Sequence, residues 1–180
     1  MSRKIKTPGN ADHQRILKAR AVALAREPLQ SEAEGERIEV VEFQLANERY
    51  AIESTYIGEV YPLKDLTRLP CTPSFVLGII NLRGRILSVI DLHTFFDLPN
   101  RGLSDLNKVI VLHDGAMEFG LLADAIITAR WIPRSTLQPS LPTLTEIRAE
   151  YLLGITPERL VVLDGGKILA DSRIVVYEEV

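Results

Sequence analysis

The residue types that most often perform catalysis or bind metal are few and scattered in this chain. Its three histidines, His13, His93 and His113, are isolated from one another, and its single cysteine, Cys71, lies in a Pro-Cys-Thr-Pro turn. Metal and nucleophilic sites usually show such residues at short spacings, as in H-E-x-x-H, or a base near the nucleophile. The sequence therefore predicts no catalytic residue, no metal and no cofactor.

Two further patterns resemble chemical sites but favour structural roles. Gly165-Gly166-Lys167 is only superficially similar to a phosphate loop, because it lacks the upstream glycine and the following Ser or Thr. We predict a hairpin turn there instead. Asp91 and Asp164 each follow an apolar run, and we expect these carboxylates to cap turns rather than to act as acids.

Composition predicts a folded protein of one domain or two very small ones. The chain has 180 residues, of which 46% are hydrophobic and 25% charged, with a formal net charge of -3. Its apolar runs are far shorter than the roughly 20 residues that span a bilayer, and no secretory signal opens the chain. We expect a cytoplasmic location, and the acidic balance argues against nucleic acid as a partner.

The N-terminal residues differ in charge from the rest. Residues 1–26 carry seven of the 21 Lys and Arg residues but one of the 24 acids. A short helix is predicted over residues 12–26, between the N-cap candidate Asp12 and the helix-stopping Pro28. We interpret residues 1–36 as a basic leader, partly helical or disordered, that folds back onto the body or reaches an acidic partner.

From residue 38 onward the pattern changes to short apolar segments separated by glycine-bearing turns. Such segments, with turn signals between them, are typical of an all-β barrel or sandwich. The predicted strands cover residues 38–45, 50–52, 77–82, 85–92, 108–112, 118–122, 160–163 and 167–169, with turns at 83–84, 114–115 and 165–166.

A weak internal repeat indicates two similar small barrels. Gly78-Ile79 and the apolar run after it resemble Gly154-Ile155 and its own following run. Tyr50-Ala51-Ile52 resembles Phe119-Gly120-Leu121 in the same way, and the copies are offset by 69 to 76 residues. That offset is too long for a solenoid repeat.

The most distinctive stretch is residues 75–92, which contains Gly78-Ile79-Ile80, then Asn81-Leu82-Arg83-Gly84, then an aliphatic strand that closes in Asp91-Leu92. Together with residues 43–52, 57–60 and 67–70, in this order, it resembles the CheW-like family of chemotaxis coupling proteins. The resemblance covers roughly residues 38–176.

This resemblance implies two five-stranded SH3-like barrels packed together, within a CheW-like domain of residues 37–180. The barrel-like halves would cover about 38–98 and 107–176, with strands that could be exchanged between them. The implied function is that of a non-catalytic adaptor. It would couple the cytoplasmic tip of a methyl-accepting chemoreceptor to the regulatory domain of a CheA-type histidine kinase, meeting the membrane only through the receptor, in membrane-associated arrays.

The resemblance also assigns roles to residues. Arg83 matches the arginine of the family motif, and the residues expected to bind receptor or kinase are Ile57, Glu59, Val60, Arg83 and Arg85. The residues expected to set motif and turn geometry are Gly78, Asn81, Leu82, Gly84 and Asp91. Other interpretations remain open: Arg83 as an exposed hairpin arginine, and Ile57 and Val60 as core.

Two other functions stay in competition with the adaptor. A regulator of the same fold could sequester the kinase or the receptor alone, and it would form no ternary complex. A small-barrel enzyme or ligand-binding protein would need a deep pocket with convergent polar groups, and the sequence shows no such cluster.

Overall fold

The protein is described by a computed structural model over residues 36–99, 102–139 and 149–174, all within the second of the two units (residues 1–34 and 35–180) into which the chain divides. The predicted leader helix lies outside these residues. No helix in the described ranges is long and apolar enough to cross a membrane. The strands there are β1 (Arg37–Leu45), β2 (Glu48–Glu53), β3 (Ile57–Pro62), β4 (Val76–Leu82), β5 (Arg85–Ile90), β6 (Lys108–His113), β7 (Glu118–Ala123), β8 (Ala125–Pro133), β9 (Leu152–Ile155) and β10 (Val161–Leu163). The helices are short: η1 (Ser54–Tyr56), α2 (Leu92–Phe95), η2 (Arg134–Thr136) and α4 (Gly165–Ala170).

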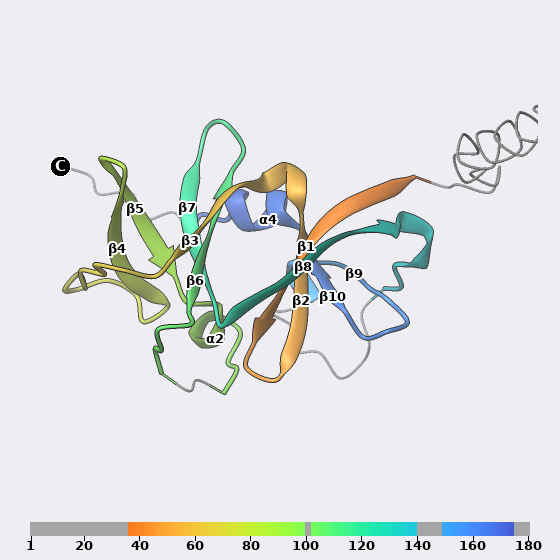
Figure 1. Ribbon diagram of the computed structural model, residues 1–180, viewed down its shortest axis with the longest axis horizontal. Helices are drawn as coiled ribbons and strands as arrows, with labels where there is room; N and C mark the ends of the chain where they lie inside the picture. The colour runs from red at the N-terminus through yellow and green to blue at the C-terminus, as the bar shows by residue number, and fades with distance from the viewer. Residues whose placement is uncertain (1–35, 100–101, 140–148, 175–180) are drawn as a thin grey trace, which may run out of the picture. The chain divides into compact units, whose positions relative to one another are not determined.

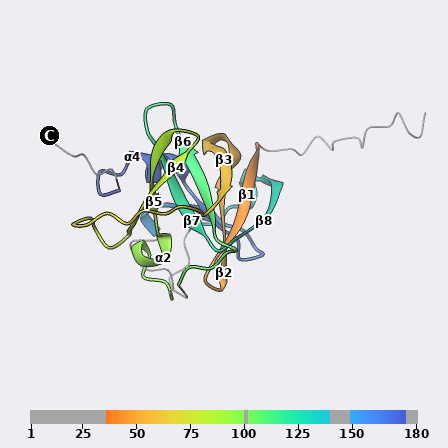
Figure 2. The same ribbon diagram turned by 60° about the vertical axis from the view of Figure 1, so that its left-hand side comes forward.

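The strands form two five-stranded sheets that share one topology. Sheet A has the order β8-β1-β2-β10-β9, and sheet B has the order β3-β6-β7-β5-β4 (Figures 1 and 2). Each of the strands β1–β5 has a counterpart among β6–β10: β1 corresponds to β6, β2 to β7, and so on. When every strand is exchanged for its counterpart, the order of one sheet becomes the order of the other. Sheet A therefore takes β1 and β2 from the first half of the chain and β8, β9 and β10 from the second. Sheet B takes β3, β4 and β5 from the first half and β6 and β7 from the second. The predicted all-β fold of two five-stranded units is confirmed.

Several strands are buried on both faces because three apolar cores border them. Core A lies against sheet A and includes Val40 and Val162, and core B lies against sheet B and includes Leu87 and Val109. A third, shared core draws on both sheets and on α2 and α4. Successive strand residues point to opposite faces, so one strand can serve two cores.

Strand β6 illustrates this double burial. Val109 and Val111 belong to core B, whereas Ile110 and Leu112 belong to the shared core, and all four are fully buried. A strand covered on both faces needs apolar residues at every position. This explains why the apolar runs that predicted β6 and β7 were continuous rather than alternating.

The helices α2 and α4 start at equivalent places, directly after β5 and β10. The Asp91 carboxylate accepts a hydrogen bond from the His93 backbone N–H at 2.9 Å, and the Asp164 carboxylate accepts one from Lys167 N–H at 3.0 Å. Both are N-cap contacts. The two aspartates thus cap the starts of helices, where the sequence had suggested turns.

The predictions for residues 165–169 were wrong, since Gly165–Ala170 forms α4 instead of a hairpin turn and a strand. The glycine pair serves close packing. A Cβ atom on Gly165 would lie 2.7 Å from Cδ2 of Tyr56. Helix α4 can pack against η1 only because this side chain is missing.

The signature stretch forms the hairpin between β4 and β5. Leu82 lies opposite Arg85, and both intervening residues have positive φ, 53° at Arg83 and 86° at Gly84. Positive φ at both positions is the requirement of a type I′ turn. The Asn81 side-chain oxygen accepts a hydrogen bond from Gly84 N–H at 2.8 Å, so Asn81 and Gly84 shape the turn.

Gly78 allows the preceding segment to cross β4 closely. It has φ 149°, and a Cβ atom on it would lie 2.3 Å from the Thr67 carbonyl oxygen. Thr67 and Ile79 pair there through two backbone hydrogen bonds of 2.8 and 2.9 Å. Gln138 pairs with Ile155 in the same way in the other half, next to Gly154, which supports the internal repeat.

We predict that Gly78→Ala destabilises the protein much more than Gly84→Ala does. Both substitutions place alanine at positive φ, which costs about 1 kcal/mol or more. Only at Gly78 does the added methyl also meet backbone, adding about 1–3 kcal/mol, because nothing lies within 4 Å of the corresponding position at Gly84. Urea unfolding at neutral pH measures the free energy of unfolding of both variants. Equal losses of stability in the two variants would contradict the close approach of Gly78 to the Thr67 backbone.

Candidate functional site

Three of the predicted binding residues meet in one cluster on sheet B. Arg83 Nη2 lies 3.1 Å from Glu59 Oε2, and Arg85 Nη2 lies 3.2 Å from Glu59 Oε1. Arg85 Nη1 also donates to Glu118 Oε2 at 2.6 Å. We call Glu59, Arg83, Arg85 and Glu118 the arginine cluster. Glu118 was not predicted from the sequence.

The topology of sheet B brings these residues together from β3, β5, β7 and the β4–β5 turn. Arg85 is shared between two carboxylates, whereas Arg83 has Glu59 as its ion-pair partner. The Arg83 side chain is 76% exposed, against 23% for Glu59. An exposed single ion pair contributes little, about 0–1 kcal/mol. Arg83 can therefore leave Glu59 for another acidic group while Arg85 still compensates the Glu59 charge.

The two apolar residues predicted on β3 have different surroundings. Ile57 is half-buried and packs against the shared core, whereas Val60 is 39% exposed. The motif residue Leu82 is 1% exposed and belongs to core B, so its role is in packing. Val60 is thus the apolar residue of the predicted β3 segment that a partner can reach.

A second exposed apolar surface follows β8 and was not predicted as a site. We call Ile127, Ala129 and Trp131 the β8 strip. Ile127 is 46% and Trp131 61% exposed, so two large apolar side chains of one strand face solvent. Ala129 lies opposite Val41 on β1, and Val41 lies opposite the shared-core residue Ile52 on β2. Ala129 and Trp131 therefore continue the sheet A face that contacts the shared core.

Val60 has the equivalent position on the other sheet. It lies opposite Ile110, a shared-core residue of β6. The strands β3 and β8 are edge strands. Each therefore extends the sheet face that contacts the shared core to a part of the surface that the core does not cover. A hydrogen bond of 2.7 Å from the Ser54 hydroxyl to Glu39 Oε2 links η1, just before β3, to β1. Val60 on one sheet, and Ala129 and Trp131 on the other, thus extend the two sheet faces that contact the shared core.

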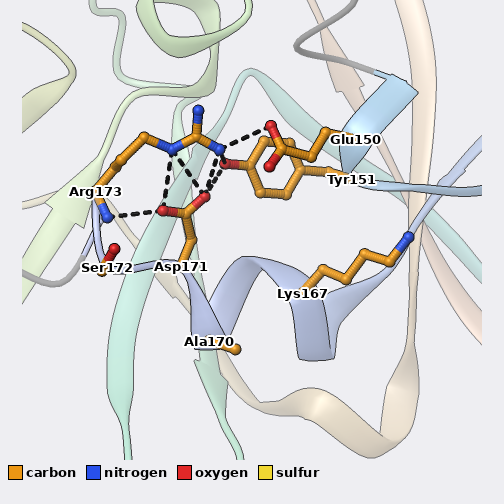
Figure 3. A pocket seen from close by; sticks show the side chains of 7 residues that line it. All are labelled: Glu150, Tyr151, Lys167, Ala170, Asp171, Ser172 and Arg173. Atoms are coloured by element: carbon orange, nitrogen blue, oxygen red, sulfur yellow. Dashed lines mark hydrogen bonds and ion pairs between the residues drawn. The ribbon is translucent and has the colours of Figure 1, made fainter.

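An open pocket of about 710 Å³ lies near the end of α4 (Figure 3). Arg173 Nη2 donates to Tyr151 Oη at 2.6 Å, to Asp171 Oδ2 at 2.7 Å and to Glu150 Oε2 at 2.8 Å. The Tyr151 hydroxyl itself donates to Asp171. These groups satisfy one another, so the arrangement ties the residues after α4 to the start of β9.

The electrostatics of this pocket agree with a structural role. Hydrogen bonds from Arg173 lower the pKa of Asp171 to about 2, and burial, with the Asp171 carboxylate beside it, raises the pKa of Tyr151. Both groups are held in their ordinary neutral-pH states, which is the opposite of tuning for acid–base chemistry. Within the described residues no group of three or more His, Cys, Asp or Glu side chains could hold a metal ion.

Comparison with known proteins gives a consistent result. The family model described as "CheW-like domain" matches residues 39–173. The chain is 30% identical over 146 residues to the chemotaxis protein CheW of Treponema pallidum, covering 77% of this chain and 86% of that protein. It is 30% identical over 136 residues to protein FrzA of Myxococcus xanthus, covering 73% and 84%.

Among solved structures, the scaffolding protein TtCheW from Thermoanaerobacter tengcongensis is similar, with a TM-score of 0.64 and 30% identity. The match covers 74% of this chain and 88% of that one. The topology described above is thus found in an experimental structure at an identity high enough to indicate more than a shared fold.

The Tyr151–Asp171–Arg173 contacts predict a pH-dependent stability. The pKa of Asp171 is lower folded than unfolded, so its contribution is complete above its usual pKa of 3.8 and is lost as the pH falls toward about 2. Asp171→Asn should therefore lower the free energy of unfolding at pH 6 and lose that deficit between about pH 4 and pH 2. Urea unfolding across this range measures the difference, with the exposed Asp105→Asn as control. If Asp171→Asn lowers the free energy of unfolding by the same amount at every pH, the result would contradict a role of the Asp171 carboxylate in these contacts.

Proposed function

The chain belongs to the CheW-like family, and from that premise we propose that it joins two signalling proteins by binding alone. It is a coupling adaptor of chemotaxis signalling, as the names of its relatives indicate. The proposed partners are the cytoplasmic tip of a chemoreceptor and the regulatory domain of a CheA-type histidine kinase. Both partners would place the protein in the cytoplasm, at receptor arrays.

The observation that carries the receptor half of the proposal is the exposed Arg83 at the tip of the family-motif hairpin. Its guanidinium lies within 3.1 Å of Glu59, the residue next to Val60. A receptor tip with an acidic side chain beside an apolar helix face would contact Arg83 and Val60 together. Charge-assisted hydrogen bonds to arginine are stronger and more directional than neutral ones, so this pair can provide both affinity and orientation.

The β8 strip extends the proposed receptor surface. Ala129 and Trp131, like Val60, extend a sheet face that contacts the shared core, and an exposed apolar surface next to polar groups is typical of a protein-binding site. Trp131 is also the single tryptophan of the chain. Its fluorescence therefore reports directly on whether a partner covers the strip.

We predict that Arg83→Glu weakens binding of a receptor-tip fragment by about tenfold or more, because it replaces an attractive charge by a repulsive one. The free energy of unfolding should change by less than about 1 kcal/mol. The matched control is Arg159→Glu, which changes an exposed, positive-φ arginine in the β9–β10 turn. Titrations followed by Trp131 fluorescence measure affinity. A large loss of stability in Arg83→Glu would make Arg83 structural, and equal loss of affinity in both variants would refute its specific role.

The kinase half is tested by calorimetric titration of the protein into the regulatory domain of a CheA-type kinase from the same cell. We expect saturable binding that persists when the receptor tip is present, since an adaptor must hold both partners at once. Binding that receptor abolishes at every concentration would identify a sequestering regulator instead. No heat and no co-migration, with the protein shown to be folded, would refute coupling to that kinase.

A further inference from the structure

His93 lies where three distant segments of the chain meet. Its Nδ1 is 2.8 Å from Asp91 Oδ1, the cap of α2, and its Nε2 is 3.1 Å from Asp124 Oδ2. Asp124 occupies the corner between β7 and β8, where the chain passes from sheet B to sheet A. The Ala46 N–H, in the β1–β2 turn, donates to the same Asp124 oxygen at 2.7 Å and also to His93 Nε2 at 3.2 Å.

The imidazole is held in a site that water scarcely reaches. The His93 side chain is 3% exposed and that of Asp91 is 4% exposed, whereas the Asp124 side chain is 28% exposed. The surrounding polar groups are also bonded: Thr94 Oγ1 donates to Asp91 Oδ2 at 2.9 Å, and Asn107 Nδ2 donates to Asp124 Oδ1 at 3.2 Å. In such a site each hydrogen bond matters, because a buried polar group without a partner is costly.

The two carboxylates favour a proton on each ring nitrogen. A carboxylate only accepts hydrogen bonds, and a neutral imidazole has a single N–H donor. With Asp91 on one side and Asp124 on the other, both contacts are attractive only for the imidazolium form. Once one proton leaves, Nε2 becomes an acceptor that faces the Asp124 carboxylate, and the Ala46 N–H is the donor remaining within reach of Nε2.

We propose that His93 is a proton-operated latch that fastens α2 to the β7–β8 corner and to the β1–β2 turn, and thereby fixes the start of β8 against sheet B. Protonated, the imidazolium bridges Asp91 and Asp124. Deprotonated, it loses the bridge to Asp124, whose carboxylate then keeps only its contacts with Ala46 and Asn107 among those described above, and the segment from Asp124 into β8 is loosened. Because β8 carries the proposed receptor surface, the latch would regulate binding of the receptor to this surface. This consequence rests on the proposed function.

The electrostatics support the latch and set its sign. The Asp91 hydrogen bond, aided by Asp124, raises the pKa of His93 above its usual 6.5 although burial opposes this. Burial alone would raise the pKa of Asp91, but hydrogen bonds from His93 and Thr94 lower it below the usual 3.8. A raised histidine pKa means that the contribution to stability is complete below 6.5 and is lost as the pH rises through the folded-state value.

The first test is an NMR titration of the His93 ring protons in the full chain, which needs no partner and so stands apart from receptor binding. We expect a midpoint above 6.5, and a midpoint at or below 6.5 would overturn the latch. In Asp124→Asn the carboxylate is replaced by a neutral amide, so the midpoint should move down toward 6.5. An unchanged midpoint in that variant would show that Asp124 does not hold the proton.

The second test follows the latch itself through solvent exchange of the Asp124 amide, which donates to the Gln44 carbonyl at 2.9 Å and so ties the β7–β8 corner to β1. The exchange is expressed as protection relative to an unfolded peptide at the same pH. Protection should fall about tenfold as the pH crosses the His93 midpoint, the change expected for one lost hydrogen bond. The step should disappear in His93→Gln and persist in His113→Gln, the matched control at the end of β6. Constant protection in the unaltered protein, or a step that survives in His93→Gln, would refute the proposal.

Discussion

The fold depends on one packing constraint, the burial of the central strands on both faces. Residues of β2, β5, β6, β7 and β10 contribute on one face to the core of their own sheet and on the other to the shared core. Because β1 and β2 complete sheet A while β3, β4 and β5 complete sheet B, neither sheet can form from one half of the chain. The shared core between the sheets is consequently a fixed part of the fold.

The same constraint decides what the sequence could predict. Doubly buried strands such as β6 appear as unbroken apolar runs, and they were found. The nine-residue β8 was not predicted as a strand. It is an edge strand with few buried residues, and a register shift opposite Glu42 and Phe43 interrupts its pairing with β1. At Gly165-Gly166 the glycines suggested a turn, but the contact with Tyr56, which is distant in sequence, decides in favour of a helix.

The candidate site was predictable to the extent that it lies in one continuous motif. Arg83 and Arg85 belong to the signature hairpin, and Glu59 belongs to a segment recognised by resemblance. Glu118 joins them only through the sheet order, since β7 lies beside β5 and β6 separates it from β3. The exposure of Trp131 could not be predicted from the sequence either. It depends on how far the shared core extends over the face of β8.

The internal repeat preserves the sheet topology while reversing the charge at one equivalent position. Counting back from the parallel pairs that join β2 to β10 and β7 to β5 places Arg49 where Glu118 lies. Glu158 lies in the β9–β10 turn, whereas Arg85 begins β5. Arg85 pairs with Glu118 in sheet B. In sheet A, Arg130 binds the Glu158 carboxylate at 3.0 Å, and Arg49 donates to the Glu158 carbonyl at 2.9 Å. A partner group complementary to Glu118 would therefore meet a like charge at Arg49, which costs affinity. Two halves of one topology can thus present different charged groups at corresponding strands.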